Sequence, residues 1–246
     1  ALYITNLLGH EGDGSLHQHL KAQGWIESLA AGSDRLDAQN AFISIDIGLT
    51  EAGAQRIESI TNAIFAYVRM LQEAPVERWR YEEQARMAEL AFRFQEQSSA
   101  TGFAYRVGPL LDQYPPQWVL AAPYLMEDFD AALIRRYLSY LRDDNLVLEV
   151  IGPDVETDQV EQWFQVPYSV AAYDPAAPGE APASLALPEP NTFIPDSLEL
   201  LANDVGGPSL VVDKPTTSIW LDQDTQFGVP RANVYLTLAV AGGLAS

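Results

Sequence analysis

"LYITNLLGHEGDGSLHQHLKAQGWIESLAAG" (residues 2–32) is the stretch that decides the fold of this chain. Its apolar start predicts a helix over residues 2–8 that ends at Gly9. The glycines and acids that follow predict a turn, and Ser15 is a typical N-cap for a second helix over residues 16–23. The stretch therefore begins with two short helices that a glycine-rich turn separates.

Two predicted strands follow these helices. The segment WIESLAAG, residues 25–32, indicates a strand that ends in small residues. In FISIDIG, residues 42–48, apolar and polar side chains alternate, so that one face carries Ile43, Ile45 and Ile47. This alternation is typical of a strand with one face buried and the other face in solvent.

Helices dominate the chain after the second strand. Thr50 is expected to cap a helix whose apolar side chains recur at helical spacing, namely Ile57, Ile60, Ile64, Val68 and Leu71. Pro75 suits the first position of a further helix over residues 75–97. Beyond it we expect helices over 103–112, 116–122 and 127–141, and a strand over 145–152. This succession predicts an α+β fold with helices packed on one face of a mainly antiparallel sheet.

The composition changes near residue 174, where prolines become dense. Prolines keep a chain extended and hinder helix formation, so we expect residues 174–200 to be an interdomain linker. Residues 1–173 then form one domain. After the linker, strand-like segments predict that residues 201–246 are the opening strands of a following domain; these segments are 209–212, 218–224 and 232–240.

Charge and composition exclude several classes of protein. Asp and Glu number 34 against 14 Lys and Arg, and the formal charge of −20 repels nucleic acid and anionic membrane surfaces. The chain has no apolar run long enough for a membrane span and no visible signal peptide, so we expect a soluble protein. Its lack of cysteine fits a bacterial cytoplasm or periplasm and does not choose between them. Without cysteine, it forms no disulfide, thiolate metal site or cysteine nucleophile. The start inside a predicted helix, without methionine, favours a fragment of a longer protein.

The chain has three histidines, His10, His17 and His19, all in the opening stretch. His10 and Glu11 look like the start of the zinc-binding motif H-E-x-x-H, but glycines follow and the second histidine is missing. No window matches the inverted motif H-x-x-E-H, and the chain has no G-x-S-x-G nucleophile elbow and no phosphate loop. We therefore predict no catalytic residue and no metal ligand. A zinc site of the three histidines in an irregular loop is the less favoured alternative.

Small residues near the histidines are the positive signal for binding. A strand that ends in Ala-Ala-Gly has little side chain at its edge, so another backbone can approach closely and add a strand. A turn and an ordinary strand end explain the same residues, and physical reasoning alone favours this simpler interpretation. The residues concerned are Gly9, Gly12, Gly14, Ala30, Ala31 and Gly32.

Residues 2–32 resemble the opening of the second, non-catalytic domain in the insulinase/pitrilysin family of zinc metalloproteases. Further stretches follow in the order of that domain: IDIGLTEAG (45–53), AFRFQE (91–96), YP (114–115), EQWFQVPY (161–168) and LPEPNTFIPDSLEL (187–200). The stretch SIWLDQDTQFGVPRANVYL (218–236) is similar to the entry to the third domain. The resemblance implies the homologous-domain fold of these proteases. In the family, the second domain has a strand before the first helix, and we expect that this first strand is missing here.

The resemblance also implies where the chemistry of the parent protein lies. In this family four homologous domains form two halves around a chamber, and zinc is held only in the first domain, on H-x-x-E-H. The equivalent helix here is residues 2–8, where Leu2 and Asn6 stand for the two zinc histidines and Thr5 for the catalytic glutamate. The resemblance thus implies that this chain alone is no enzyme and holds no cofactor. Zinc is expected in the first domain of its parent, a zinc metalloendopeptidase.

In the insulinase group, the second domain contributes an exosite that holds the N-terminal end of peptide substrates by strand addition. Carried over, the substrate-binding residues are Gly9, His10, Glu11, Leu29, Ala30, Ala31 and Gly32. Glu11 is expected to pair with the α-amino group of the peptide. Two residues depart from the family, because Asn6 stands where histidine is frequent and Ala31 where glycine is frequent.

The resemblance implies that this region lines the peptide chamber and helps to anchor substrates. Its expected partners are peptide substrates and the other domains of the parent chain, with no nucleic acid and no membrane. The alternative is a purely structural scaffold, a degenerate copy of the catalytic domain that does not contact substrate.

Overall fold

A computed structural model of the chain describes residues 1–37, 39–126, 128–173, 181–195, 197–200, 207–223 and 228–238. The chain divides into two compact units. The first unit comprises residues 1–92 and 98–191, and the second unit comprises residues 93–97 and 192–246. Each sheet among the described residues is an antiparallel strand pair, and helices accompany these pairs in the first unit. The predicted α+β class is confirmed.

A long hairpin forms the main sheet of the first unit. Strand β1 (Ile26–Arg35) pairs with β2 (Ala41–Leu49) in a register that places Ala31 opposite Ile45. The three isoleucines of β2 are half-buried against the core, as their alternation predicts. Both predicted strands are confirmed, and the structure shows in addition that they pair with each other.

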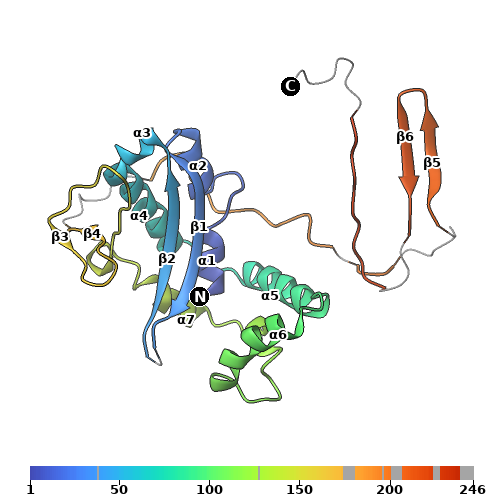
Figure 1. Ribbon diagram of the computed structural model, residues 1–246, viewed down its shortest axis with the longest axis horizontal. Helices are drawn as coiled ribbons and strands as arrows, with labels where there is room; N and C mark the ends of the chain where they lie inside the picture. The colour runs from blue at the N-terminus through green and yellow to red at the C-terminus, as the bar shows by residue number, and fades with distance from the viewer. Residues whose placement is uncertain are drawn as a thin grey trace. The chain divides into compact units, whose positions relative to one another are not determined.

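Helices cover one face of this hairpin, as predicted (Figure 1). They include α1 (Leu2–Leu8), α2 (Leu16–Ala22) and α4 (Ile57–Glu73). The side-chain oxygen of Ser15 accepts a hydrogen bond from the main-chain nitrogen of Gln18 at 3.1 Å, so the predicted N-cap of α2 is confirmed. The opening stretch therefore folds as its local signals predict.

The helix after β2 begins differently from the prediction. Thr50 caps only the four-residue helix α3 (Glu51–Ala54), and α4 starts anew after Arg56. The main-chain nitrogen of Thr50 donates to the carbonyl oxygen of Trp25 at 3.0 Å, and its hydroxyl donates to that of Gly24 at 2.7 Å. These bonds tie α3 to the start of β1, and the chain must change direction before it can follow the hairpin as α4.

The core lies between the hairpin and these helices. Most of its fully buried side chains come from the opening stretch, and the largest of them are Tyr67, Ile4, Leu8, Leu16 and Leu20. Full burial of a large apolar side chain contributes about 1.5–3 kcal/mol. The stability of the first unit therefore depends on α1 and α2 as much as on the longer α4.

Helix α5 (Arg78–Arg93) is shorter than the helix predicted over residues 75–97, and Pro75 lies before it rather than at its first position. None of its side chains is buried. Because tertiary packing supplies most of the stability of a helix in a protein, an unburied helix ends sooner than its sequence pattern suggests.

The shorter helices are confirmed in part. α6 (Ala100–Val107) continues into the 3-10 helix η1 (Gly108–Asp112), close to the predicted range 103–112. The helix predicted over 116–122 is wrong, since turns precede a short 3-10 helix, η2 (Ala122–Tyr124). The prolines at 115, 116 and 123 explain this, because they lack the N–H group that a helix needs. Among the residues that the structure describes, no helix combines the length and the apolar character needed to cross a bilayer.

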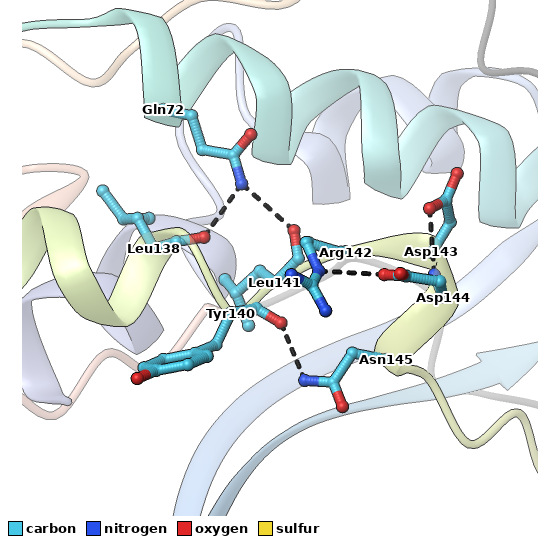
Figure 2. Close-up of polar contacts among 8 residues, drawn as sticks. All are labelled: Gln72, Leu138, Tyr140, Leu141, Arg142, Asp143, Asp144 and Asn145. Carbon is cyan, nitrogen blue, oxygen red and sulfur yellow. Dashed lines mark hydrogen bonds and ion pairs between the residues drawn. The ribbon is translucent and has the colours of Figure 1, made fainter.

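Helix α7 (Ala131–Leu138) is shorter than the helix predicted over 127–141, of which residue 127 lies outside the described residues. Its C-terminal carbonyl groups are satisfied from outside the helix (Figure 2). The side-chain amide of Gln72 on α4 donates to the carbonyl oxygens of Leu138 at 2.8 Å and Leu141 at 3.1 Å. A capping amide of this kind fixes the end of α7 against α4.

The polar contacts continue beyond α7 to Asn145, the last residue of the short 3-10 helix η3 (Asp143–Asn145) (Figure 2). Its side-chain amide donates to the carbonyl oxygen of Tyr140 at 2.9 Å, and the guanidinium of Arg142 lies 2.9 Å from the carboxylate of Asp144. These bonds close the turn after α7, so the chain leaves the helix in a defined direction.

The strand predicted over residues 145–152 is wrong. This segment has no strand partner among the described residues, and Val147 and Ile151 are 92% and 87% exposed. Apolar alternation yields a strand only where a neighbouring strand supplies hydrogen bonds. The pairing that follows is instead the short ladder of β3 (Gln159–Val160) with β4 (Pro167–Tyr168).

The second unit contains one described hairpin, of β5 (Ser209–Lys214) with β6 (Thr217–Leu221). The strand predicted over 209–212 is confirmed, and that over 218–224 ends at Leu221, with residue 224 outside the described residues. Residues 232–238 are not a strand, so the prediction for 232–240 is wrong for all of its described part. As at residues 145–152, a β-forming sequence pattern does not produce a strand where no partner strand pairs with it.

Candidate functional site

The end of α1 lies directly against the middle of β1. A methyl group placed on Gly9 would be 3.2 Å from the carbonyl oxygen of Thr5, 3.3 Å from the main-chain nitrogen of Ala31 and 3.4 Å from its Cβ. Gly9 has a φ of −92°, so its backbone conformation is open to any residue. These distances are tight for a Cβ atom, so glycine suits a helix end that lies this close to the strand. The structure thus brings together two of the predicted binding residues.

A buried tyrosine on α4 holds this helix end. The hydroxyl of Tyr67 donates to the carbonyl oxygen of Leu7 at 3.2 Å, and the side chain has no exposed surface. Burial raises the pKa of Tyr67 to about 12, partly offset by the guanidinium of Arg80. Tyr67 was not among the predicted site residues, although a tyrosine among the apolar positions of α4 signals a hydroxyl that needs a buried partner.

The imidazole of His10 is used inside its own turn. Its Nδ1 accepts a hydrogen bond from the main-chain nitrogen of Gly12 at 3.1 Å. A methyl group on Gly12 would lie 2.6 Å from Cε1 of the same ring, so the ring covers that glycine. Glu11, by contrast, is exposed and has no hydrogen bond or ion pair within the described part of the chain. Of the two exposed carboxylates of this turn, that of Asp13 accepts a hydrogen bond from Gln18, so that of Glu11 is the more available to a ligand.

The predicted residues of β1 divide between the core and the surface. Leu29 is a core side chain with 5% exposure, so only its main chain can meet a ligand. Ala30 is exposed and lies opposite Asp46, while Ala31 and Gly32 are half-buried. Within the described residues β2 is the only strand that pairs with β1, so the other edge of β1 has no strand neighbour there.

The three histidines do not converge. His10 belongs to the turn, while the Nδ1 atoms of the other two face different surroundings. That of His17 is buried without a partner in the described structure, and that of His19 lies 2.8 Å from the hydroxyl oxygen of Ser184. Burial lowers the pKa of His19. No group of three His, Cys, Asp or Glu side chains suited to a metal ion occurs among the described residues.

The helix that stands where a zinc helix is expected offers no ligands. The hydroxyl of Thr5 donates to the carbonyl oxygen of Leu2 at 3.3 Å, inside α1, and Asn6 is exposed. Leucine, threonine and asparagine here supply neither imidazole nor carboxylate. The residues of α1 therefore do not fit a zinc ion, and the absence of zinc from this chain stays a prediction.

Two family models match the chain. The model described as the peptidase M16 inactive domain matches residues 1–87, and the model described as the middle or third domain of peptidase M16 matches residues 92–243. Together they cover nearly the whole chain, with the inactive domain before the middle or third domain.

Curated relatives match along almost the full chain. "Nardilysin-like" of Arabidopsis thaliana is 31% identical and covers 99% of this chain, and "Insulin-degrading enzyme" of Homo sapiens is 30% identical and covers 94%. "A-factor-processing enzyme" of Saccharomyces cerevisiae is 30% identical over 95% of the chain. The alignments take up 26%, 24% and 24% of these relatives, so the chain spans about a quarter of their length.

A solved structure supports the same fold. The crystal structure of pitrilysin superposes with a TM-score of 0.77 over 92% of this chain and 25% of that chain. The sequence identity is 23%, so this likeness concerns the fold.

Proposed function

Because the chain belongs to the peptidase M16 (insulinase/pitrilysin) family and begins with that family's inactive domain, we propose that it is a peptide-anchoring region of a longer zinc metalloendopeptidase. In this proposal it cleaves nothing itself. It lines the peptide chamber and holds the N-terminal segment of a substrate beside β1 by strand addition. Residues 1–173 form the inactive domain, residues 174–200 the linker, and residues 201–246 the start of the next domain.

The observation that carries the proposal is the contact of Gly9 with the main chain of Ala31. Glu11, whose side chain is exposed, follows Gly9 by two residues along the chain, and Gly9 lies against β1, a strand with small side chains and no second strand neighbour among the described residues. Main-chain hydrogen bonds to the edge of such a strand recognise any extended peptide. A carboxylate near the bound N-terminus of the peptide would favour a free α-amino group.

A scaffold without substrate contact is the second candidate, and two observations favour it. The imidazole of His10 is engaged by Gly12, and the side chain of Leu29 is committed to the core. Both residues have structural roles that need no ligand. If the scaffold interpretation holds, the family resemblance of this turn reflects folding alone.

Peptide binding separates the two candidates. We expect an unstructured peptide with a free N-terminus to bind the chain weakly in isothermal titration. The same peptide N-methylated at alternate main-chain nitrogens should bind far less, because methylation removes strand hydrogen bonds and leaves the side chains unchanged. Equal binding of both peptides would contradict strand addition, and no binding of either would favour the scaffold.

The role of Glu11 is tested by a cycle of two changes. N-acetylation of the peptide and the substitution Glu11→Gln each remove one charge of the proposed pair. We expect either change to weaken binding about two- to fivefold, as is usual for exposed ion pairs, and both together to cost little more than one. Strictly additive losses would contradict a contact between Glu11 and the α-amino group.

The proposal also predicts the metal content of the chain. Since α1 offers no ligand, metal analysis of the purified chain should find well below one zinc per molecule, and peptidase assays should show no cleavage. Stoichiometric zinc with zinc-dependent cleavage would overturn the proposal that this region is non-catalytic and that the zinc site lies elsewhere in the parent.

A further inference from the structure

Residues 184–191 pack on the first unit although they fall within the predicted linker. The main-chain nitrogen of Ala186 donates to the carbonyl oxygen of Gly14 at 2.9 Å. The hydroxyl oxygen of Ser184 lies 2.8 Å from Nδ1 of His19. We call residues 184–191 the strap. Its N-terminal end therefore contacts the turn of residues 10–15 and helix α2.

The other end of the strap is held by α5. The guanidinium of Arg80 donates to the carbonyl oxygen of Pro188, and the main-chain nitrogen of Asn191 donates to the carboxylate of Glu83 at 2.9 Å. Between these points the side chain of Leu185 is 8% exposed and belongs to the core cluster. An extended segment with main-chain bonds at both ends and a buried anchor is a docked element.

The contact at Gly14 is unusually close. Gly14 has a φ of +75°, and a methyl group on it would lie 2.7 Å from Cβ and 3.0 Å from the main-chain nitrogen of Ala186. The other hydrogen bonds of this turn are local: the main-chain nitrogens of Gly12, Gly14 and Ser15 donate to His10, Gln18 and Gly12, and the side-chain amide of Gln18 donates to Asp13. The strap thus adds a hydrogen bond from a distant part of the sequence to a turn that is otherwise held by its immediate neighbours.

We propose that the strap holds the turn of residues 10–15 in the conformation that presents Glu11 beside β1. Its release frees the turn and weakens peptide binding. The chain passes from the strap into the second unit at Thr192. The effect on peptides rests on the proposed function, while the hold on the turn does not.

Two glycines provide a matched test. Gly14 and Gly24 flank α2 with φ values of +75° and +71°, so alanine strains the backbone similarly at both. A methyl group on Gly24 has no atom within 4 Å, whereas one on Gly14 collides with the strap. The difference between Gly14→Ala and Gly24→Ala in the full 246-residue chain therefore isolates the strap contact.

Hydrogen exchange is the primary measurement. Gly14→Ala should increase deuterium uptake in residues 10–15 and in residues 184–188, and Gly24→Ala should leave the second segment unchanged. Ala186→Pro, which deletes the donated N–H, should reproduce the pattern without altering the turn sequence. Unchanged uptake in either segment, in both strap variants, would overturn the proposal.

Peptide affinity then tests the coupling. Both strap variants should bind the unmodified probe peptide about fivefold more weakly than Gly24→Ala does, the effect expected for loss of about one hydrogen bond. Increased exchange with unchanged affinity would overturn the coupling. If the unaltered chain binds no peptide, the proposed function fails, and the exchange result alone still decides whether the strap holds the turn.

Discussion

The hydroxyl of Tyr67 gives a prediction that combines a substitution with a pH dependence. Tyr67→Phe keeps the buried ring and removes the hydrogen bond to the carbonyl oxygen of Leu7. That carbonyl lies at the end of α1, where no further helical turn supplies a donor. Leaving a buried acceptor without a partner costs about 1–3 kcal/mol. We expect the free energy of unfolding to fall by this amount at pH 7.

The same residue predicts how stability changes at high pH. Burial raises the pKa of Tyr67 from 10.0 to about 12. Because the folded-state pKa is the higher one, the contribution is complete below pH 10 and is lost as the pH rises from 10 to about 12. A shift of this size corresponds to about 3 kcal/mol. The Phe variant has no ionisable group at this position and lacks this part of the alkaline loss.

Urea unfolding followed by tryptophan fluorescence measures both effects. Equal m-values for the two proteins would show that the comparison is valid, and stability should be recorded at pH 7 and between pH 9 and 11. Tyr105→Phe is the matched control, since Tyr105 is 80% exposed and should change nothing. A Tyr67 variant within about 0.3 kcal/mol of the unaltered chain at pH 7, or parallel pH curves, would refute the reasoning.

Three further predictions concern stability. Gly53→Ala should cost about 3 kcal/mol or more, measured by urea unfolding, because its methyl group would lie 1.8 Å from the carbonyl oxygen of Trp25; a small loss would contradict this clash. Burial lowers the pKa of His19, so the unfolded chain takes up the proton first and stability should fall as the pH drops below 6.5. In the variant His19→Gln, the urea midpoint should change less between pH 7.5 and 5.5. Gln72→Ala should lower the melting temperature by about 2–4 °C through loss of the bonds that cap α7, and no shift would show that water replaces them.

The opening stretch was the most predictable part of the fold. Its two helices, the Ser15 cap and both strands of the main hairpin were predicted from local signals and are confirmed. The order of motifs along the chain also predicted the family, which the family models confirm. The two strand predictions that were wrong, at residues 145–152 and 232–238, rested on patterns for which the described structure holds no strand partner. The helix predicted over 116–122 was wrong because prolines interrupt it.

The candidate site, too, was only partly predictable from the sequence. Residue types alone did not indicate that Gly9 and Ala31 lie together; the family resemblance did. The binding role of all seven predicted residues stays a prediction. Only the tertiary structure shows that Leu29 is buried, that the imidazole of His10 accepts a hydrogen bond from Gly12, and that Tyr67 supports the end of α1. Each of these depends on a contact that the sequence pattern does not specify.

The sequence by itself determined the helix and strand segments of the opening stretch, its caps and turn, the acidic surface charge and the membership of the family. These depend on hydrogen bonds and amphipathic periods within a few residues, which short patterns encode directly. Only the tertiary structure decided that β1 pairs with β2, that Gly9 abuts Ala31, and that the proline-rich strap docks against Gly14. Such contacts join distant segments, and their free energy depends on which surfaces the whole fold brings together.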